Sequence, residues 1–422
     1  MPAINLPTRA TGLTCNVPRR PDWSRGSFMS CCVRKEKTMN ILASSHYVIK
    51  TDRLFTPDEL RGTFWVEIEA GRIKHTLTEQ PSGIEVLDAT GFLVAPGFID
   101  VHIHGYGGHD IMEASSEALE CMATGLPHAG VTSFLPTTVG ARIATLQHVM
   151  TTLSSKLATV EGARPLGWHL EGPFLNEKMP GAMNPEDFEI PTIANAEALL
   201  DSGPVTLMAM APEREGAIPV IEYLVSRGVH VSIGHTDTDF EHAVAGIAAG
   251  ATSMNHLFNV MRPLLHREPG PVGAAFLYDV YLQFIADGVH THPATIALVS
   301  RYLKERLVLI SDSILAAGLG IQGEFVFFNG LKVTVDETSV RLPGGRLAGS
   351  ILTLDRAVRN VVNIGGLDLA SAFRAAGQNP ARSIGVTERG IIRPGAVADI
   401  VILTPDLHVS STICEGSVVY SA

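Results

Sequence analysis

The chain has 422 residues and a formal net charge of −11, and it is 45% hydrophobic but only 18% charged. The acidic balance excludes nucleic acid as an expected partner, because proteins that bind it present basic surfaces. No apolar run reaches the roughly 20 residues that a membrane-spanning helix needs, so we expect no membrane partner either.

Residues 1–38 differ from the remainder of the chain because they are basic, contain several prolines and show no hydrophobic periodicity. They lack the apolar core of a signal peptide, so we predict a disordered leader with Met39 as the functional start. The five cysteines have no spacing typical of a disulfide framework or a thiolate zinc site. Together these features predict a cytoplasmic protein.

Short strands separated by turn residues are predicted at both ends of the chain. Residues 39–94 contain β-branched and alternating apolar positions in Phe64–Ile68 and Glu85–Ala89. Residues 394–422 contain a similar β-branched apolar run in Ile400–Leu403. This pattern is typical of β-strands. We expect the two terminal segments to pair into one small β-sandwich domain.

Residues 95–393 alternate apolar strands with Ala- and Leu-rich segments of helical length, such as 117–129, 218–227 and 293–304. The predicted strands are Leu93–His104, Thr132–Thr138, Leu166–Glu171, Val205–Ala211, Val229–His235, Ser253–His256, Leu282–Asp287 and Leu307–Asp312. Such an alternation predicts an α/β fold with parallel strands, a (β/α)8 TIM-like barrel. A Rossmann-type sheet is the alternative, but no glycine fingerprint follows an early strand.

Residues with metal-binding side chains stand at the predicted ends of these strands. They are His102 and His104 on the first strand, Glu171 on the third, His235 on the fifth, His256 on the sixth and Asp312 on the eighth. The carboxyl ends of barrel strands form one rim, so these side chains should converge. Because imidazole and carboxylate groups suit zinc and related ions, the pattern predicts a metal site rather than isolated capping residues.

The residue types also indicate a chemistry. A divalent ion lowers the pKa of a water molecule and polarises a carbonyl oxygen. Asp312 is the expected general base, which takes a proton from water and later gives it to a leaving amine, and a role as a metal ligand is compatible with this. Glu171 would either bridge two ions or bind a single ion. His169 shares a face with Glu171, and we expect it beside the ligands rather than among them.

Several motifs between residues 40 and 420 carry a resemblance. They are Pro96-Gly-Phe-Ile-Asp-Val-His-Ile-His-Gly105, His169-Leu-Glu-Gly-Pro-Phe174, Gly234-His-Thr236, Asn255-His-Leu-Phe-Asn259, Arg267-Glu-Pro-Gly270, Ala286-Asp-Gly288, Ser311-Asp312, Leu347-Ala-Gly-Ser350 and Asn379-Pro-Ala-Arg382. Together they resemble the amidohydrolase superfamily and, within it, the N-acetylglucosamine-6-phosphate deacetylase family. Many amidohydrolases use a carbamylated lysine on the fourth strand. Residues 205–213 contain no lysine, and Glu171 takes that place, as in the deacetylases.

The resemblance implies that Glu171, His235 and His256 hold a divalent ion, and that His102 and His104 offer a second site. We expect one or two ions and zinc as the metal, although iron, manganese and cobalt also suit such ligands. The family's catalytic acid/base maps to Asp312.

The resemblance also implies which residues contact the substrate. The sugar-phosphate contacts of the family map to Asn259, Val260, His290 and Arg267, and the loop after the third strand adds Ala182 and Met183. Arg267 reaches the phosphate bound by a neighbouring subunit in such enzymes, which implies a homodimer.

Met183 is the one departure from the family pattern with a chemical consequence. The family reads Lys-Gly-Ala-His-Asn-Pro where this chain reads Met179-Pro-Gly-Ala-Met-Asn-Pro185, and a thioether cannot donate the hydrogen bond of the missing histidine. The expected activity is hydrolysis of the N-acetyl group of N-acetylglucosamine 6-phosphate to glucosamine 6-phosphate and acetate, in amino-sugar catabolism. The alternatives are a related sugar such as N-acetylgalactosamine 6-phosphate, or another C–N amide substrate. A non-catalytic scaffold is the least favoured reading, because all six metal-site residues are present.

Overall fold

The computed structural model describes residues 45–327 and 330–422. The predicted leader, residues 1–38, lies outside the described residues. The first and last parts of the described chain contribute strands to the same sheet. These strands are β1 (His46–Phe55), β2 (Glu59–Glu69), β3 (Arg72–Leu77), β4 (Glu85–Asp88), β5 (Leu93–Pro96), β20 (Ile400–Leu403), β21 (Val409–Cys414) and β22 (Ser417–Ser421).

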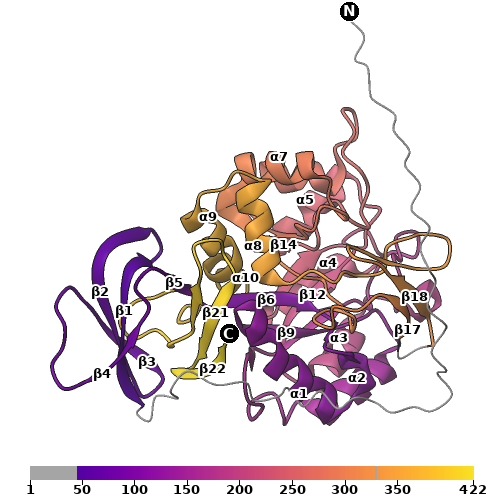
Figure 1. Cartoon of the computed structure of the whole chain (residues 1–422). Helices are drawn as coiled ribbons and strands as arrows, with labels where there is room; N and C mark the ends of the chain where they lie inside the picture. The colour runs from indigo at the N-terminus through magenta and orange to yellow at the C-terminus, as the bar shows by residue number, and fades with distance from the viewer. Residues whose placement is uncertain (1–44, 328–329) are drawn as a thin grey trace, which may run out of the picture. The chain divides into compact units, whose positions relative to one another are not determined.

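The terminal sheet runs in the order β22-β21-β20-β5-β1-β2-β3, with β4 beside β1. The antiparallel pair β5–β20, with Ile400 opposite Pro96, joins the two ends of the chain. In Figure 1 the indigo strands β1–β4 lie at the left, and the yellow strands β21 and β22 lie between them and the barrel. Residues from both halves of the sheet, such as Ile49, Val66 and Ile413, share one apolar cluster. The sheet formed by both ends of the chain therefore has an apolar cluster of its own.

Parallel strands form the barrel that carries the site. They are β6 (Phe98–Ile103), β9 (Val131–Thr138), β11 (Trp168–Glu171), β12 (Val205–Met210), β13 (His230–Ile233), β14 (Ser253–Met254), β15 (Tyr281–Phe284) and β16 (Leu307–Leu309), with β10 (Arg164–Pro165) beside β9. Each strand pairs with the next one in sequence. The backbone N–H of Asp312 donates to the carbonyl of His102 at 2.9 Å, which brings the end of the barrel back to its start. The predicted TIM-like barrel is confirmed.

Helices surround the barrel strands. They are α1 (Ser116–Gly125), α2 (Ile143–Leu153), α3 (Ile193–Leu200), α4 (Ala217–Ser226), α5 (Phe240–Ala248), α6 (Gly270–Leu277), α7 (Pro293–Leu303), α8 (Leu354–Asn363), α9 (Leu369–Phe373) and α10 (Asn379–Ser383). Local sequence sets several starts, because Ser115, Thr192 and Asp239 each cap a helix with a side-chain oxygen. Within residues 45–327 and 330–422, no helix is long and apolar enough to cross a membrane.

Aromatic packing joins the terminal sheet to the barrel. The ring of Phe373 on α9 meets Phe55 of β1 edge-on, with centroids 4.7 Å apart, and stacks on Phe98 of β6 at 6.3 Å. All three side chains are buried. The barrel and the terminal sheet thus share apolar core, which fixes the first barrel strand and its histidines.

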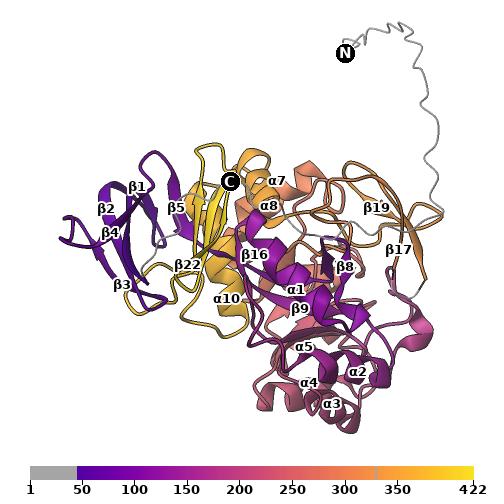
Figure 2. The same ribbon diagram turned by 60° about the horizontal axis from the view of Figure 1, so that its bottom comes forward.

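A three-stranded antiparallel sheet follows the last barrel strand, and the sequence analysis did not predict it. It consists of β17 (Gly323–Val326), β18 (Lys332–Val335) and β19 (Val340–Arg341), shown beside the barrel in Figure 2. Val333, Val335 and Val340 pack with Ile314 and Ala348 into a separate small cluster. The strands are two to four residues long and largely exposed, so their apolar pattern is weak.

Candidate metal centre and active site

His102 and His104 leave the end of β6 with both rings on the same side. Their Nε2 atoms lie 3.2 Å apart, and both rings are buried. The chain turns immediately afterwards at Gly105, where an added Cβ would lie 2.4 Å from the carbonyl oxygen of His109. Only glycine fits this close approach, so the turn that follows the two histidines depends on it.

Glu171, at the end of β11, connects these histidines to a second pair. Its Oε1 lies 3.1 Å from Nε2 of His235 and 2.9 Å from Nε2 of His256, while its Oε2 lies 3.3 Å from Nε2 of His104. The result is two possible ligand groups that share this carboxylate, one with His102 and His104 and one with His235 and His256. The ligand atoms of each group lie within 4.8 Å of one another. This donor set suits a divalent metal ion.

The outer nitrogens of all four histidines have oxygen partners. Nδ1 of His102 lies 3.1 Å from the amide oxygens of both Asn255 and Gln283. The other three Nδ1 atoms face backbone carbonyl oxygens at 2.9–3.1 Å, in the pairs His104–Thr137, His235–Met179 and His256–Asn259. An Nδ1–H that donates to oxygen leaves Nε2 with a lone pair directed into the centre.

These Nε2 lone pairs need a positive partner. The Nε2 atoms of His235 and His256 are 3.1 Å apart, nearly the same separation as in the other pair. Two lone pairs at that distance repel each other unless a cation or a proton lies between them. The orientation of the histidines therefore fits a bound metal.

Asp312 stands beside the first pair of histidines. Its Oδ1 lies 3.3 Å from Nε2 of His104 and 3.4 Å from Nε2 of His102. Burial alone raises the pKa of this carboxyl group, but the positive charge that His102 and His104 carry when protonated outweighs burial and lowers the pKa. The pKa of Glu171 is likewise lowered, because His102 and His235 outweigh its burial. Both carboxyl groups are thus ionised at neutral pH.

Three of these residues have unusual backbone conformations. His235, His256 and Asp312 have φ angles of 47°, 22° and 49°. Such conformations cost non-glycine residues about 1–3 kcal/mol each and persist where the surrounding structure enforces them, often at functional sites. The strain coincides with the rim at which the predicted ligands meet.

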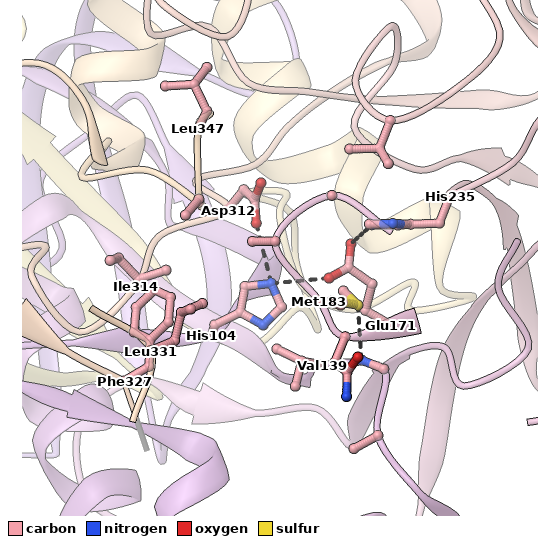
Figure 3. A pocket seen from close by; sticks show the side chains of 18 of the residues that line it. His104, Val139, Glu171, Met183, His235, Asp312, Ile314, Phe327, Leu331 and Leu347 are labelled. Carbon is pink, nitrogen blue, oxygen red and sulfur yellow. Dashed lines mark hydrogen bonds and ion pairs between the residues drawn. The ribbon is translucent and has the colours of Figure 1, made fainter. Parts of the chain in front are cut away.

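The centre opens into a cavity of about 480 Å³. In Figure 3, Asp312, His104, Glu171 and His235 are joined in that order by dashed contacts, and the apolar side chains of Ile314, Leu331 and Phe327 lie together on one side of them. Of the predicted substrate-binding residues, the cavity lining includes Ala182, Met183, Asn259, Val260 and His290. Arg267 is exposed and does not belong to the lining.

Two of the lining residues have partners that define their chemistry. Burial lowers the pKa of His290, but its ring lies 2.6 Å from the Asp287 carboxylate, and the net effect raises the pKa. This favours a positive His290 at the cavity. The sulfur of Met183 lies 3.1 Å from the backbone nitrogen of Gly140, so this side chain is held against the cavity wall.

His169 lies beside the ligands, as predicted. Its ring packs edge-on against His102 with centroids 4.7 Å apart, and its Nδ1 lies 3.3 Å from the Thr137 hydroxyl. Burial and the neighbouring His102 lower its pKa well below the usual range, so this ring is neutral.

The sequence analysis assigned no role to several residues of the site. Asn255 and Gln283 support the ligands, while Arg142, Phe327, Leu331 and Arg346 line the cavity. Asn255 directly precedes His256, which is a usable sequence signal. Gln283 lies on β15, and the four lining residues lie in connections whose path over the cavity depends on the fold.

The fold and the site together define a metal-dependent hydrolase barrel, and comparisons with known proteins agree. The model of the Amidohydrolase family matches residues 93–419. The N-acetylgalactosamine-6-phosphate deacetylase of Escherichia coli O157:H7 is 36% identical over 375 residues, which cover 88% of this chain and 98% of that protein. The N-acetylglucosamine-6-phosphate deacetylase of Bacillus subtilis (strain 168) is 34% identical over 389 residues, covering 88% and 97%.

A solved structure extends the comparison to the fold. The crystal structure of N-acetyl-D-glucosamine-6-phosphate deacetylase from Mycobacterium smegmatis has a TM-score of 0.83 and 32% identity, and covers 89% of this chain and 100% of that chain. This chain therefore belongs to the amidohydrolase family.

Proposed function

We propose that the protein hydrolyses N-acetylglucosamine 6-phosphate to glucosamine 6-phosphate and acetate. The observation that carries the proposal is the placement of ionised Asp312 next to two histidine pairs that share Glu171, all facing one cavity. The names of the relatives from B. subtilis and M. smegmatis support this substrate.

The chain's own residues supply the steps of acetyl transfer to water. A divalent ion held by Glu171 and the histidines would lower the pKa of a water molecule and polarise the acetyl carbonyl. Asp312 takes the proton of the attacking water and delivers it to the nitrogen of the leaving amine. Its lowered pKa keeps this carboxyl group deprotonated at neutral pH, which is the form that can accept a proton.

We extend the proposal to two ions, one for each ligand group, with zinc as the expected metal. Iron, manganese and cobalt remain compatible with the same donors. Chelation followed by reconstitution with each metal, with the bound metal counted by elemental analysis, would test this part.

A homodimer is also part of the proposal, with Arg267 reaching the phosphate site of the neighbouring subunit. Arg267 is exposed on a loop whose Leu264 and Leu265 are each 51% exposed, which suits a surface covered by a second copy. A monomeric mass in solution would contradict it. The cytoplasmic location stays a prediction from the cysteine pattern.

A second candidate substrate is N-acetylgalactosamine 6-phosphate. Met183 lines the cavity where the family histidine is expected, and the E. coli O157:H7 relative is named for that sugar. Loss of a polar contact to a sugar hydroxyl costs about 1–3 kcal/mol if the hydroxyl stays unsatisfied, which is enough to change the preferred epimer.

Acetate release by metal-loaded protein tests both candidates. The assay compares the two 6-phosphates with their unphosphorylated sugars and includes a Met183→His variant. Preference for the gluco 6-phosphate supports the leading proposal. If the wild type prefers the galacto epimer and Met183→His reverses this preference, the second candidate is supported. Absence of acetate release from all four sugars would contradict both.

A further inference from the structure

Arg346 occupies a fixed position at the cavity. Its carbonyl oxygen accepts a hydrogen bond from the backbone N–H of Leu342 at 2.8 Å, which closes a tight turn after β19. Leu347, Ala348 and Gly349, which follow it, also line the cavity. The next residue, Ser350, donates its backbone N–H to the carbonyl oxygen of Asp312 at 2.8 Å. The backbone of Arg346 is thus tied to the strand end that carries Asp312.

The side chain of Arg346 reaches toward the opposite wall. Its Nη1 donates to the carbonyl oxygen of Gly181 at 2.9 Å. A Cβ built on Gly181 would lie 3.1 Å from Cε1 of His235 and 3.3 Å from Cγ2 of Val260. The guanidinium therefore spans from the Asp312 side of the cavity to the side of His235 and Val260, where the family resemblance places sugar-phosphate contacts.

The charge of Arg346 is not neutralised within the described part of the chain. Arg346 has no carboxylate within 4.0 Å among these residues, and its single side-chain hydrogen bond leaves further N–H donors unused. Arg142, the other arginine of the cavity lining, differs because it faces Asp187 at 3.4 Å and Glu189 at 3.7 Å. Arg346 therefore offers the cavity an uncompensated positive charge from its own subunit.

We propose that Arg346 binds the 6-phosphate of the substrate from within the same chain and sets the preference for phosphorylated over unphosphorylated sugars. The proposal rests on the function proposed above and adds to it a residue of this chain. A planar guanidinium with free N–H groups matches phosphate oxygens well. Because the chain from Arg346 to Gly349 lines the cavity, this contact would form inside the cavity that contains Asp312 rather than at a distant surface.

The test compares substrates that differ only in the phosphate. Arg346→Gln and Arg346→Lys are assayed with the 6-phosphate of the preferred sugar and with the same sugar lacking it, using metal-loaded protein. Lys332→Gln is the matched control, because it removes the same charge from an exposed position on β18, near Arg346 in sequence but outside the cavity lining. Calorimetric binding of glucosamine 6-phosphate and of glucosamine gives a readout independent of turnover.

Arg346→Gln should lower kcat/KM for the phosphorylated sugar about 10- to 100-fold, mainly through KM, as expected for the loss of a charge-assisted contact. Its activity on the unphosphorylated sugar should stay at the wild-type value. Arg346→Lys should recover part of the loss, and Lys332→Gln should show none.

Other results would overturn the proposal in distinguishable ways. An equal loss with both substrates would mean that Arg346 only holds the Gly181 loop. Unchanged preference in Arg346→Gln, in an active protein, would exclude the phosphate contact and leave the proposed function intact. If the wild-type protein releases no acetate from either sugar, the proposed function is wrong. If Arg346→Gln binds glucosamine 6-phosphate as tightly as the wild type does, and glucosamine likewise, the Arg346 proposal is wrong.

Discussion

Asn255 supports both halves of the candidate metal centre, and its replacement by leucine tests how the centre is held. Its amide nitrogen donates to Oε1 of Glu171 at 2.9 Å, and its amide oxygen lies 3.1 Å from Nδ1 of His102. The side chain is fully buried, so water cannot replace either bond. Gln283 remains as a second acceptor for His102, at 3.1 Å. The main loss in Asn255→Leu is therefore the bond to the shared carboxylate.

The size of the effect follows from that bond. A hydrogen bond to a charged group contributes about 1.5–3 kcal/mol, which corresponds to roughly 13- to 160-fold in affinity at about 1.36 kcal/mol per tenfold. If each ligand group holds an ion, as proposed, Asn255→Leu should weaken the binding of both ions by this factor, because Glu171 belongs to both groups. The matched variant Gln283→Leu loses only a neutral bond, so we expect about 2- to 13-fold at the His102 site alone.

The assay is competition between the protein and a chelator of known affinity, with zinc as the metal and thermal melting as the check on folding. Wild-type affinity in Asn255→Leu would refute the reasoning, because the outer hydrogen bonds would then not position the ligands. An equal effect of Gln283→Leu on both ions would refute the assignment of two groups that share Glu171.

Three further results are expected. Asp312→Asn keeps the size of the side chain, but the amide cannot accept the proton. With the metal retained, kcat should therefore fall about 10²- to 10⁴-fold. A loss of less than about tenfold in a metal-loaded sample would mean that Asp312 does not transfer the proton. Phe373→Ala should lower the free energy of unfolding in urea by about 3–5 kcal/mol, because it opens a cavity between the terminal sheet and the barrel; a change near zero would mean that this packing is dispensable. The hydrogen bond from Arg164 lowers the pKa of Glu415 from 4.5 to about 2. Burial opposes this shift, and Arg389 adds to it. The folded state binds this proton less readily than the unfolded chain, so the stabilisation is present above pH 4.5 and is lost as the pH falls toward 2. The urea midpoints of wild type and Glu415→Gln should therefore converge on acidification, and a constant gap would contradict the ion pairs.

The sequence predicted the barrel well because its strands are fully buried. Strands β6, β9 and β11 consist entirely of buried residues, and each appears in the sequence as a run of mainly apolar and β-branched residues with a few polar ones, such as Asp100 and Ser133, inside it. Where such a run ends in a histidine or a carboxylate, barrel topology alone places that residue on the rim. His102, His104, Glu171, His235, His256 and Asp312 were found together for this reason.

The rest of the site depends on contacts that no local pattern encodes. Gln283 lies in the interior of β15, where sequence analysis treats it as one polar residue in an apolar strand. Its role depends on a histidine 181 positions away. Similarly, Phe327 and Arg346 lie in or near short exposed strands, and only the path of the chain after β16 brings them to the cavity.

The measurement that tests the central claim most directly is acetate release from N-acetylglucosamine 6-phosphate before chelation, after chelation and after zinc is restored. The arrangement of Glu171 between the two histidine pairs predicts that release stops on chelation, returns with zinc, and is absent from a Glu171→Gln variant under all three conditions. Acetate release that continues at the original rate in the chelated protein would contradict the account.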